Sequence, residues 1–221
     1  MKTLFIPTRG AADRPILIYF LLAFGITWGV GGLALLTGKI RPGDASELHP
    51  LHYLAAFGPS IAGVIMAAST DGWAGVRRLL ARLVPSWSAV PWYLAVLIGF
   101  PALNLVAARL LAPDFVPRPP AWLLAPDFLA RLSPWYRLFA LLPFTLVNDT
   151  GPLGEEFGWR GFALPRMLQR WRPLAAALIL GVIWWAWHLP TFFIPALSQH
   201  QLSIPLFLVN VLALSVIMTW L

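Results

Sequence analysis

The sequence contains no cysteine. It has few charged residues, and acidic residues are fewer than basic ones. Of its 221 residues, nine are Asp or Glu and sixteen are Lys or Arg. The absence of cysteine excludes disulfides, thiolate metal sites and a cysteine nucleophile. Charged residues make up only 11% of the chain and hydrophobic residues 59%. That composition excludes an ordinary soluble domain of this length.

Long apolar runs indicate a membrane protein instead. A spanning helix needs about 20 mostly apolar residues, and the alternation over segments of about ten residues that an outer-membrane barrel would show is missing. The sequence therefore predicts an all-α fold, a polytopic transmembrane helical bundle with about seven membrane segments. The six clearest runs are Pro15–Thr37, Tyr53–Thr70, Pro91–Ala112, Trp135–Thr150, Pro173–Leu189 and Ser203–Leu221.

The rest of the chain is predicted to form short Pro-rich loops, and Lys and Arg residues lie at the ends of the spans. The expected loops are Arg41–Pro50, Asp71–Val90 and Pro113–Pro134. The net charge of +7 comes from Lys and Arg at the ends of the spans, where orientation and lipid headgroups explain it, so no nucleic-acid partner is expected. The first run is too long for a signal peptide and should remain in the mature protein. We predict a single integral membrane domain over residues 1–221, with a motif-bearing core at 141–221.

Three charged residues stand close together within the apolar sequence. Glu155, Glu156 and Arg160 lie in the stretch from Gly151 to Phe162. An ionised side chain in the bilayer core costs at least a few kcal/mol, so such residues pair, line a cavity or take part in chemistry. Gly151 and Pro152 should end the preceding helix, and a new helix is expected to begin at Gly154 or Glu155.

A histidine is predicted to face these carboxylates. The new helix should end at the polar corner Gln169–Pro173, and the next helix should run to His188, where Pro190 stops it. The midpoint of positions 155 and 188 is 171.5, inside that corner. At equal helical rise, Glu155 and His188 therefore fall at the same depth of an antiparallel hairpin.

Simpler explanations exist for each residue taken alone. Glu156 and Arg160 are spaced as an ordinary helical ion pair, and His188 beside tryptophans could belong to an interfacial aromatic belt. Together, however, a carboxylate and an imidazole can activate a water for attack on a carbonyl. His49 and His52 could share a metal, but an interfacial loop explains them better.

The spacing of these residues resembles a known family. Glu-Glu-x-x-x-Arg at 155–160 and an aromatic residue four before a histidine, Trp184 and His188, are similar to the first two motifs of the CAAX prenyl protease and bacteriocin-processing family, also called CPBP or Abi. Its members are helical intramembrane endopeptidases. The resemblance implies that Glu155 activates water with His188 as partner, and that Glu156 and Arg160 support the motif.

The resemblance also implies partners and a location. The substrate would be a peptide or a membrane protein, and the style of the motifs suggests the plasma membrane of a bacterium, with leader peptides, bacteriocins or membrane anchors as substrates. No tightly bound metal is expected, since the His-Glu-x-x-His spacing of a zinc helix is absent. Zinc held by Glu155 and His188 is the alternative, in keeping with the family's metalloprotease label.

One family feature is missing. Members carry a further helix with a second histidine followed four residues later by Asn or Asp, and this sequence reaches Leu221 where that helix would approach. His200 and Asn210 do not have the required spacing. The chain is therefore expected to be incomplete relative to the family, with doubtful activity, or to be a non-catalytic membrane immunity or scaffold protein. A transporter with a broken helix is a third hypothesis. The distribution of Lys and Arg does not decide the orientation in the membrane.

Overall fold

The computed structural model describes residues 9–39, 50–84, 86–99, 102, 106, 109–110, 151–195 and 197–221. All regular structure in these ranges is helical, which confirms the all-α fold. The chain divides into two compact units, Met1–Arg82 with Asp149–Leu221, and Leu83–Asn148. That the whole chain is one membrane domain stays a prediction.

The candidate site lies in the first unit. Its elements are α1 (Arg9–Leu36), α2 (Pro50–Ala56), α3 (Gly58–Leu80) with the short 3-10 helix η2 (Ala81–Leu83), the π-helices η6 (Gly151–Glu156) and η7 (Trp159–Ala163), α8 (Leu164–Met167), α9 (Pro173–His188), the 3-10 helices η8 (Leu189–Phe193) and η9 (Ser198–Gln201), and α10 (Ile204–Trp220). In the second unit the described elements are η3 (Trp87–Ala89), α4 (Val90–Leu94) and the π-helix η4 (Ala95–Gly99).

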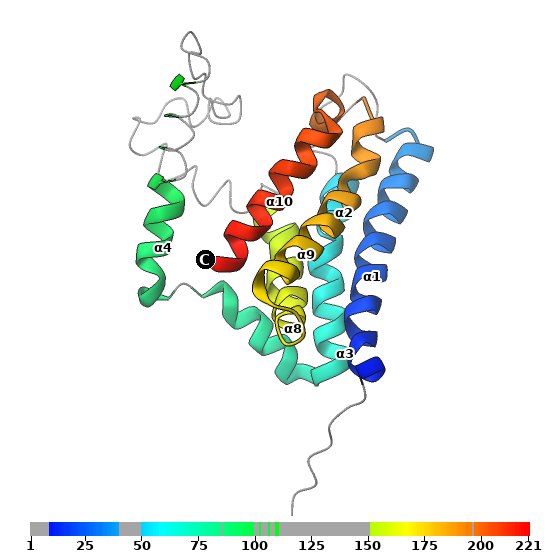
Figure 1. Cartoon of the computed structure of the whole chain (residues 1–221). Coiled ribbons are helices and arrows are strands. Elements are labelled where there is room, and N and C mark those ends of the chain that lie inside the picture. The colour runs from blue at the N-terminus through cyan, green and yellow to red at the C-terminus, as the bar shows by residue number, and fades with distance from the viewer. Residues whose placement is uncertain are drawn as a thin grey trace, which may run out of the picture. The chain divides into compact units, whose positions relative to one another are not determined.

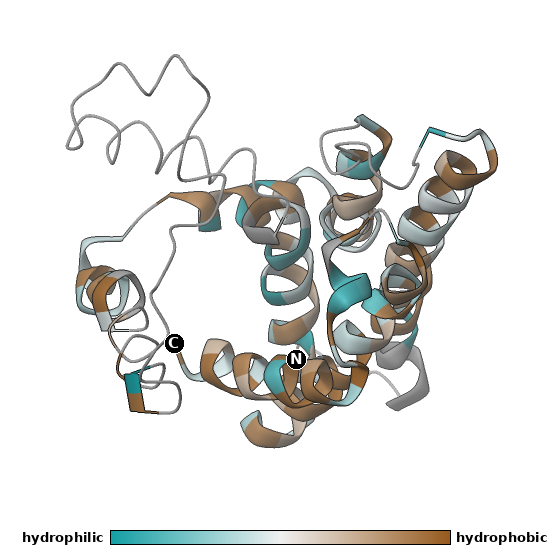
Figure 2. Ribbon diagram, turned by 90° about the horizontal axis from the view of Figure 1, so that it is seen from above, coloured by the Kyte–Doolittle hydropathy of each residue, from teal (hydrophilic) through white to brown (hydrophobic). Residues whose placement is uncertain are grey.

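The helices of the first unit pack around a core that is rich in aromatic residues. Helix α1 packs against α3, and α9 against α10 (Figure 1). Tyr19, Trp159 and Phe162 are almost completely buried between them. Hydrophobic residues predominate along these helices (Figure 2). Some of their side chains face outward, with Leu21 65% and Leu206 71% exposed. Helices that are apolar all round belong in a bilayer, so the fold is a helical membrane bundle.

The described spans differ in detail from the predicted ones. Among the described residues, two helical stretches are long and apolar enough to cross a membrane, Arg14–Leu36 and Pro173–Phe193. The predicted span Tyr53–Thr70 is instead bent by 52° between α2 and α3. The bend lies at the Gly-Pro pair that begins α3, where proline lacks the N–H that a continuous helix requires. Most of Pro91–Ala112 and all of Trp135–Thr150 lie outside the described residues.

The predicted helical hairpin is present. The first arm runs through η6, η7 and α8, the chain turns after Met167, and α9 begins at Pro173 and ends at His188 as expected. The expected helix start at Gly154 or Glu155 is wrong, because the helical run already includes Gly151. Two stretches of this arm are π-helical, a wide-turn form that is rare and frequently found at functional sites.

The prediction of a loop over Asp71–Val90 is also wrong for the first residues of that range. Helix α3 continues to Leu80, although Gly72 has non-helical angles of φ 61° and ψ −157°. Only glycine adopts such a conformation without strain. The glycine therefore interrupts the regular helix locally without ending it.

Candidate active site

Glu155 and His188 meet inside the first unit. Glu155 is near the end of η6 and His188 is the last residue of α9. Glu155 Oε2 lies 3.9 Å from His188 Nε2, and the two side chains are 11% and 10% exposed. The distance is too long for a direct hydrogen bond. A water lying off the line that joins them would be about 2.8 Å from both atoms.

The hydrogen bond at the other ring nitrogen sets the tautomer of His188. Nδ1 lies 2.9 Å from the carbonyl oxygen of Trp184. A carbonyl only accepts, so Nδ1 carries the proton and donates it. In the neutral ring, Nε2 therefore presents its lone pair toward Glu155. Thr191 Oγ1 donates to the His188 carbonyl at 2.7 Å and holds the end of the helix.

Glu155 is oriented by the same helix. The indole Nε1 of Trp184 donates to Glu155 Oε2 at 2.7 Å, the oxygen that also faces His188. A charge-assisted hydrogen bond of this length fixes the carboxylate firmly.

Glu156 and Arg160 form a separate pair one helical position away. Arg160 Nη1 lies 3.0 Å from Glu156 Oε1 and 2.9 Å from Oε2. The two side chains are 20% and 12% exposed. The guanidinium also lies over the ring of Trp184, 4.3 Å from its centroid. The ion pair that the i,i+4 spacing predicts is therefore present, and it is mostly buried.

Aromatic rings enclose the imidazole. The ring of Trp187 meets His188 edge to face with centroids 4.7 Å apart, and Phe207 lies 5.2 Å away. Such edge-to-face contacts are the favoured geometry of ring pairs. The aromatic contacts make two sides of the histidine ring apolar, whereas Nε2 faces the carboxylate of Glu155.

A very close helix approach brings the carboxylates into the bundle. A Cβ added at Gly158 would collide with the carbonyl of Pro59 and with the hydroxyl of Tyr19. Ser60 Oγ, at the start of α3, donates to the Leu153 carbonyl at 2.6 Å. Only glycine at position 158 lets η6 and η7 lie this close to α3.

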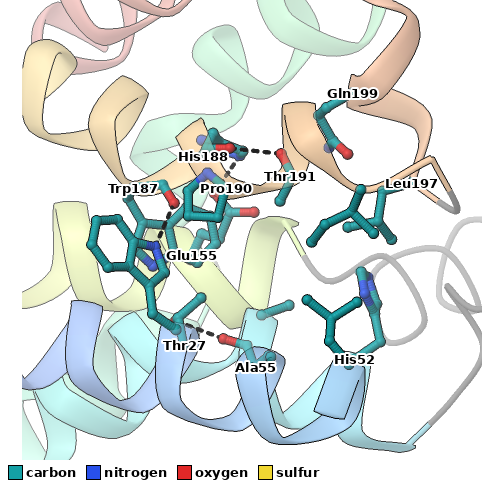
Figure 3. A pocket seen from close by; sticks show the side chains of 16 residues that line it. Thr27, His52, Ala55, Glu155, Trp187, His188, Pro190, Thr191, Leu197 and Gln199 are labelled. Carbon is teal, nitrogen blue, oxygen red and sulfur yellow. Dashed lines mark hydrogen bonds and ion pairs between the residues drawn. The ribbon is translucent and has the colours of Figure 1, made fainter. Parts of the chain in front are cut away.

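A cavity of about 200 Å³ opens beside the pair. In Figure 3, Glu155 and His188 lie close together in its wall, and His52, Leu197 and Gln199 lie across from them. Its lining is mostly apolar and consists of Thr27, Trp28, Gly31, Gly32, Leu35, His52, Ala55, Ala56, Glu155, Trp187, His188, Pro190, Thr191, Ile194, Leu197 and Gln199. An apolar pocket with a few converging polar groups is the usual form of a small-ligand site.

Two side chains of α1 hold opposite walls of this cavity. Thr27 Oγ1 donates to the Ala55 carbonyl of α2 at 2.7 Å. Trp28 Nε1 donates to the carbonyl of Trp187, next to His188, at 3.0 Å. Adjacent residues of α1 are thus bonded to α2 and to the last turn of α9.

Comparison with known proteins finds a similarity in the C-terminal part of the chain. Residues 135–221 match the profile of the type II CAAX prenyl endopeptidases described as Rce1-like. Over these residues the chain is similar to that family. It is also 32% identical over 72 residues to CAAX prenyl protease 2 of Methanococcus maripaludis.

That alignment covers 30% of this chain and 27% of the M. maripaludis protein. The chain therefore matches about a quarter of its relative's length. No solved structure matches. Both matches bear the name of CAAX prenyl proteases.

The structure brings all four predicted site residues into one region, with Glu155 beside His188 and Glu156 beside Arg160. Zinc sites have three or four protein ligands, and Glu155 with His188 would supply two. Among the described residues, no group of three His, Cys, Asp or Glu could hold a metal ion. These residues do not by themselves fit a zinc site.

Other predicted positions have different surroundings. His49 lies outside the described residues, whereas His52 is on helix α2, not in a loop, and lines the cavity. His200 sits in the short helix η9, and its Nδ1 lies 2.8 Å from the Phe192 carbonyl. Asn210 is exposed on α10.

Sequence reasoning did not find the contribution of α1. Thr27, Trp28, Gly31 and Gly32 line the cavity. An added Cβ at Gly31 or Gly32 would have nothing within 4 Å, so these glycines border open space. Hydropathy alone does not indicate that this face of the helix lines a cavity.

Proposed function

We propose that the chain is an intramembrane endopeptidase of the CAAX protease type in which Glu155 and His188 activate a water. The single observation that carries the proposal is the 3.9 Å separation of Glu155 Oε2 and His188 Nε2 in a buried site beside an apolar cavity. The Rce1-like match supports the same reaction class. Localisation in a bacterial plasma membrane is part of the proposal.

The chemistry follows from the two atoms. A water between them donates one hydrogen bond to Glu155 and the other to Nε2 of His188. As the water oxygen attacks the scissile carbonyl carbon, Glu155 takes its proton and the carbonyl electrons move onto the oxygen. When the C–N bond breaks, that proton passes to the leaving amine. The first products are a carboxylic acid and an amine, and the second proton of the water then passes from the acid to the amine to give a carboxylate and an ammonium group.

Glu156 and Arg160 have a supporting role in this scheme. Their ion pair connects η6 to η7, and the guanidinium packs on Trp184 of α9. The pair thereby joins the two arms of the hairpin beside the reacting groups without contributing a proton to the reaction.

The cavity indicates the class of substrate. Its apolar lining suits an apolar side chain next to the scissile bond of a membrane-inserted peptide. Leader peptides, bacteriocins and membrane anchors are the proposed substrates. A prenylated CAAX peptide, suggested by the name of the M. maripaludis relative, is the competing substrate.

The test is hydrolysis in oxygen-18 water. The protein in lipid vesicles is incubated with a hydrophobic peptide library and with a prenylated CAAX peptide, and the products are analysed by mass spectrometry. We expect one heavy oxygen in the new carboxylate, and no product with Glu155→Gln. Absence of cleavage for both substrate types would contradict the proposal and favour a non-catalytic immunity or scaffold protein.

A further inference from the structure

Trp184 makes three contacts with the groups around the site. Its indole N–H donates to Glu155 Oε2 at 2.7 Å. Its main-chain carbonyl accepts from Nδ1 of His188 at 2.9 Å. Its ring faces the guanidinium of Arg160 at 4.3 Å. One residue therefore contacts both members of the proposed pair and the arginine beside them.

We infer that Trp184 is a positioning residue that sets the separation and orientation of Glu155 and His188. The carbonyl fixes the imidazole and its tautomer, and the indole N–H fixes the carboxylate oxygen that faces Nε2. With both groups tied to the same residue, the space for the water between them is fixed before any substrate binds. Preorganisation of this kind favours the transition state.

The three contacts differ in what they demand of the side chain. Any residue at position 184 supplies the carbonyl, and any aromatic ring supplies a face for Arg160. Only tryptophan offers an indole N–H at the observed position. The hydrogen bond to Glu155 can therefore be removed while the other two contacts remain.

Trp185 provides a matched control on the same helix. It is also partly buried, and its Nε1 donates to the Ile204 carbonyl of α10 at 3.4 Å. Removing that N–H leaves the site untouched. A general effect of losing a tryptophan N–H from α9 would appear equally at both positions.

The first experiment does not depend on enzymatic activity. The protein is labelled with nitrogen-15 at the indole nitrogens of its twelve tryptophans and studied by NMR in micelles, and Trp184→Phe and Trp185→Phe assign the two signals. Glu155→Gln replaces a charged acceptor by a neutral one, so we expect it to move the Trp184 signal and to leave the Trp185 signal in place. An unmoved Trp184 signal would overturn the inference.

The second experiment measures kinetics and rests on the proposed function. Position 184 carries Phe or benzothienylalanine, which keeps the bicyclic shape and has sulfur in place of the N–H. We expect kcat to fall by about 10- to 100-fold in both variants, the size of a lost hydrogen bond to a charged group. KM should stay within about two-fold, since the substrate cavity is unchanged, and Trp185→Phe should keep the normal kcat.

The outcomes separate the two hypotheses. An unchanged kcat in the benzothienylalanine variant, or an equal loss in Trp185→Phe, would overturn the positioning role. A wild-type protein that cleaves nothing, while the Trp184 signal still responds to Glu155→Gln, would contradict the proposed function and support the hydrogen bond that underlies this inference.

Discussion

Two clusters of charge in this protein have nearly the same ion-pair distances and very different surroundings. In the first, Arg160 lies 2.9 Å from Glu156, with side chains 12% and 20% exposed. In the second, Asp71 lies 3.1 Å from Arg78 and 3.0 Å from Arg166, with exposures of 38%, 64% and 26%. Distance alone therefore does not distinguish the two.

The difference in burial decides what each cluster contributes. Exposed pairs are worth about 0 to 1 kcal/mol. In a buried pair, loss of one partner leaves a charge without compensation and costs about 3 to 5 kcal/mol. Glu155 differs in that it accepts a hydrogen bond from the indole N–H of Trp184 and lies beside the imidazole of His188. A buried carboxylate in such surroundings is suited to chemistry more than to stability.

The largest expected effect tests this contrast at Glu155. Glu155→Gln removes the proposed base and keeps the shape of the side chain, so cleavage should fall by about 10³-fold or more. The free energy of unfolding should change by no more than about 1 kcal/mol. Peptide cleavage and equilibrium unfolding in mixed micelles measure the two quantities. Residual activity comparable to wild type would exclude Glu155 as the base.

The neighbouring carboxylate should give the opposite result. Glu156→Gln leaves Arg160 without its buried partner, so the free energy of unfolding should fall by about 3 to 5 kcal/mol. Cleavage per folded molecule should be affected less than in Glu155→Gln. The control is the double variant Glu156→Gln with Arg160→Met, which removes both charges and should recover part of the loss. Equal loss of activity at positions 155 and 156 would contradict the division of roles.

A substitution at Gly158 tests whether close helix packing is needed to bury the pair of Glu156 and Arg160. Gly158→Ala places a methyl group against the Pro59 carbonyl, so the helices must separate, at a cost of about 1 to 3 kcal/mol for overpacking. Gly25, where an added Cβ has nothing within 4 Å, is the matched control. Unfolding measurements on Gly158→Ala and Gly25→Ala give the comparison. Similar stability of the two variants would mean that the close approach is unnecessary.

The smallest effect belongs to the exposed cluster. Asp71→Asn removes the carboxylate shared by Arg78 and Arg166. The free energy of unfolding should change by no more than about 1 kcal/mol, and the change should shrink further at high salt because exposed charges are screened. A loss as large as that of Glu156→Gln would show that burial does not separate the two clusters.

The sequence was sufficient to predict the hairpin but not the full site. The helical segments that carry Glu155 and His188 are connected by one short corner, and Pro173 and Pro190 mark the limits of α9. Local rules of helix formation could therefore place the two residues together. The π-helical turns of η6 and η7 have no comparable sequence signal. Both turns pack against α3, and Gly158 between them lies close to Pro59.

The cavity could not be predicted for a different reason. Its walls combine Thr27 and His52 with Leu197 and Gln199, residues that are far apart in the sequence. Hydropathy identifies α1 as a membrane helix but does not say which helices it contacts. Such pairings depend on the shape of the whole unit, as the hydrogen bond between Trp28 and Trp187 illustrates.

The two hydrogen bonds of α1 have a consequence for how the walls of the cavity are held together. Thr27 and Trp28 are consecutive residues, and they bind the carbonyls of Ala55 and Trp187 on opposite walls of the cavity. One helix therefore ties α2 to the last turn of α9 beside the cavity. Loss of either hydrogen bond would remove one of these two connections, whereas the contacts of Trp184 with Glu155 and His188 do not involve α1.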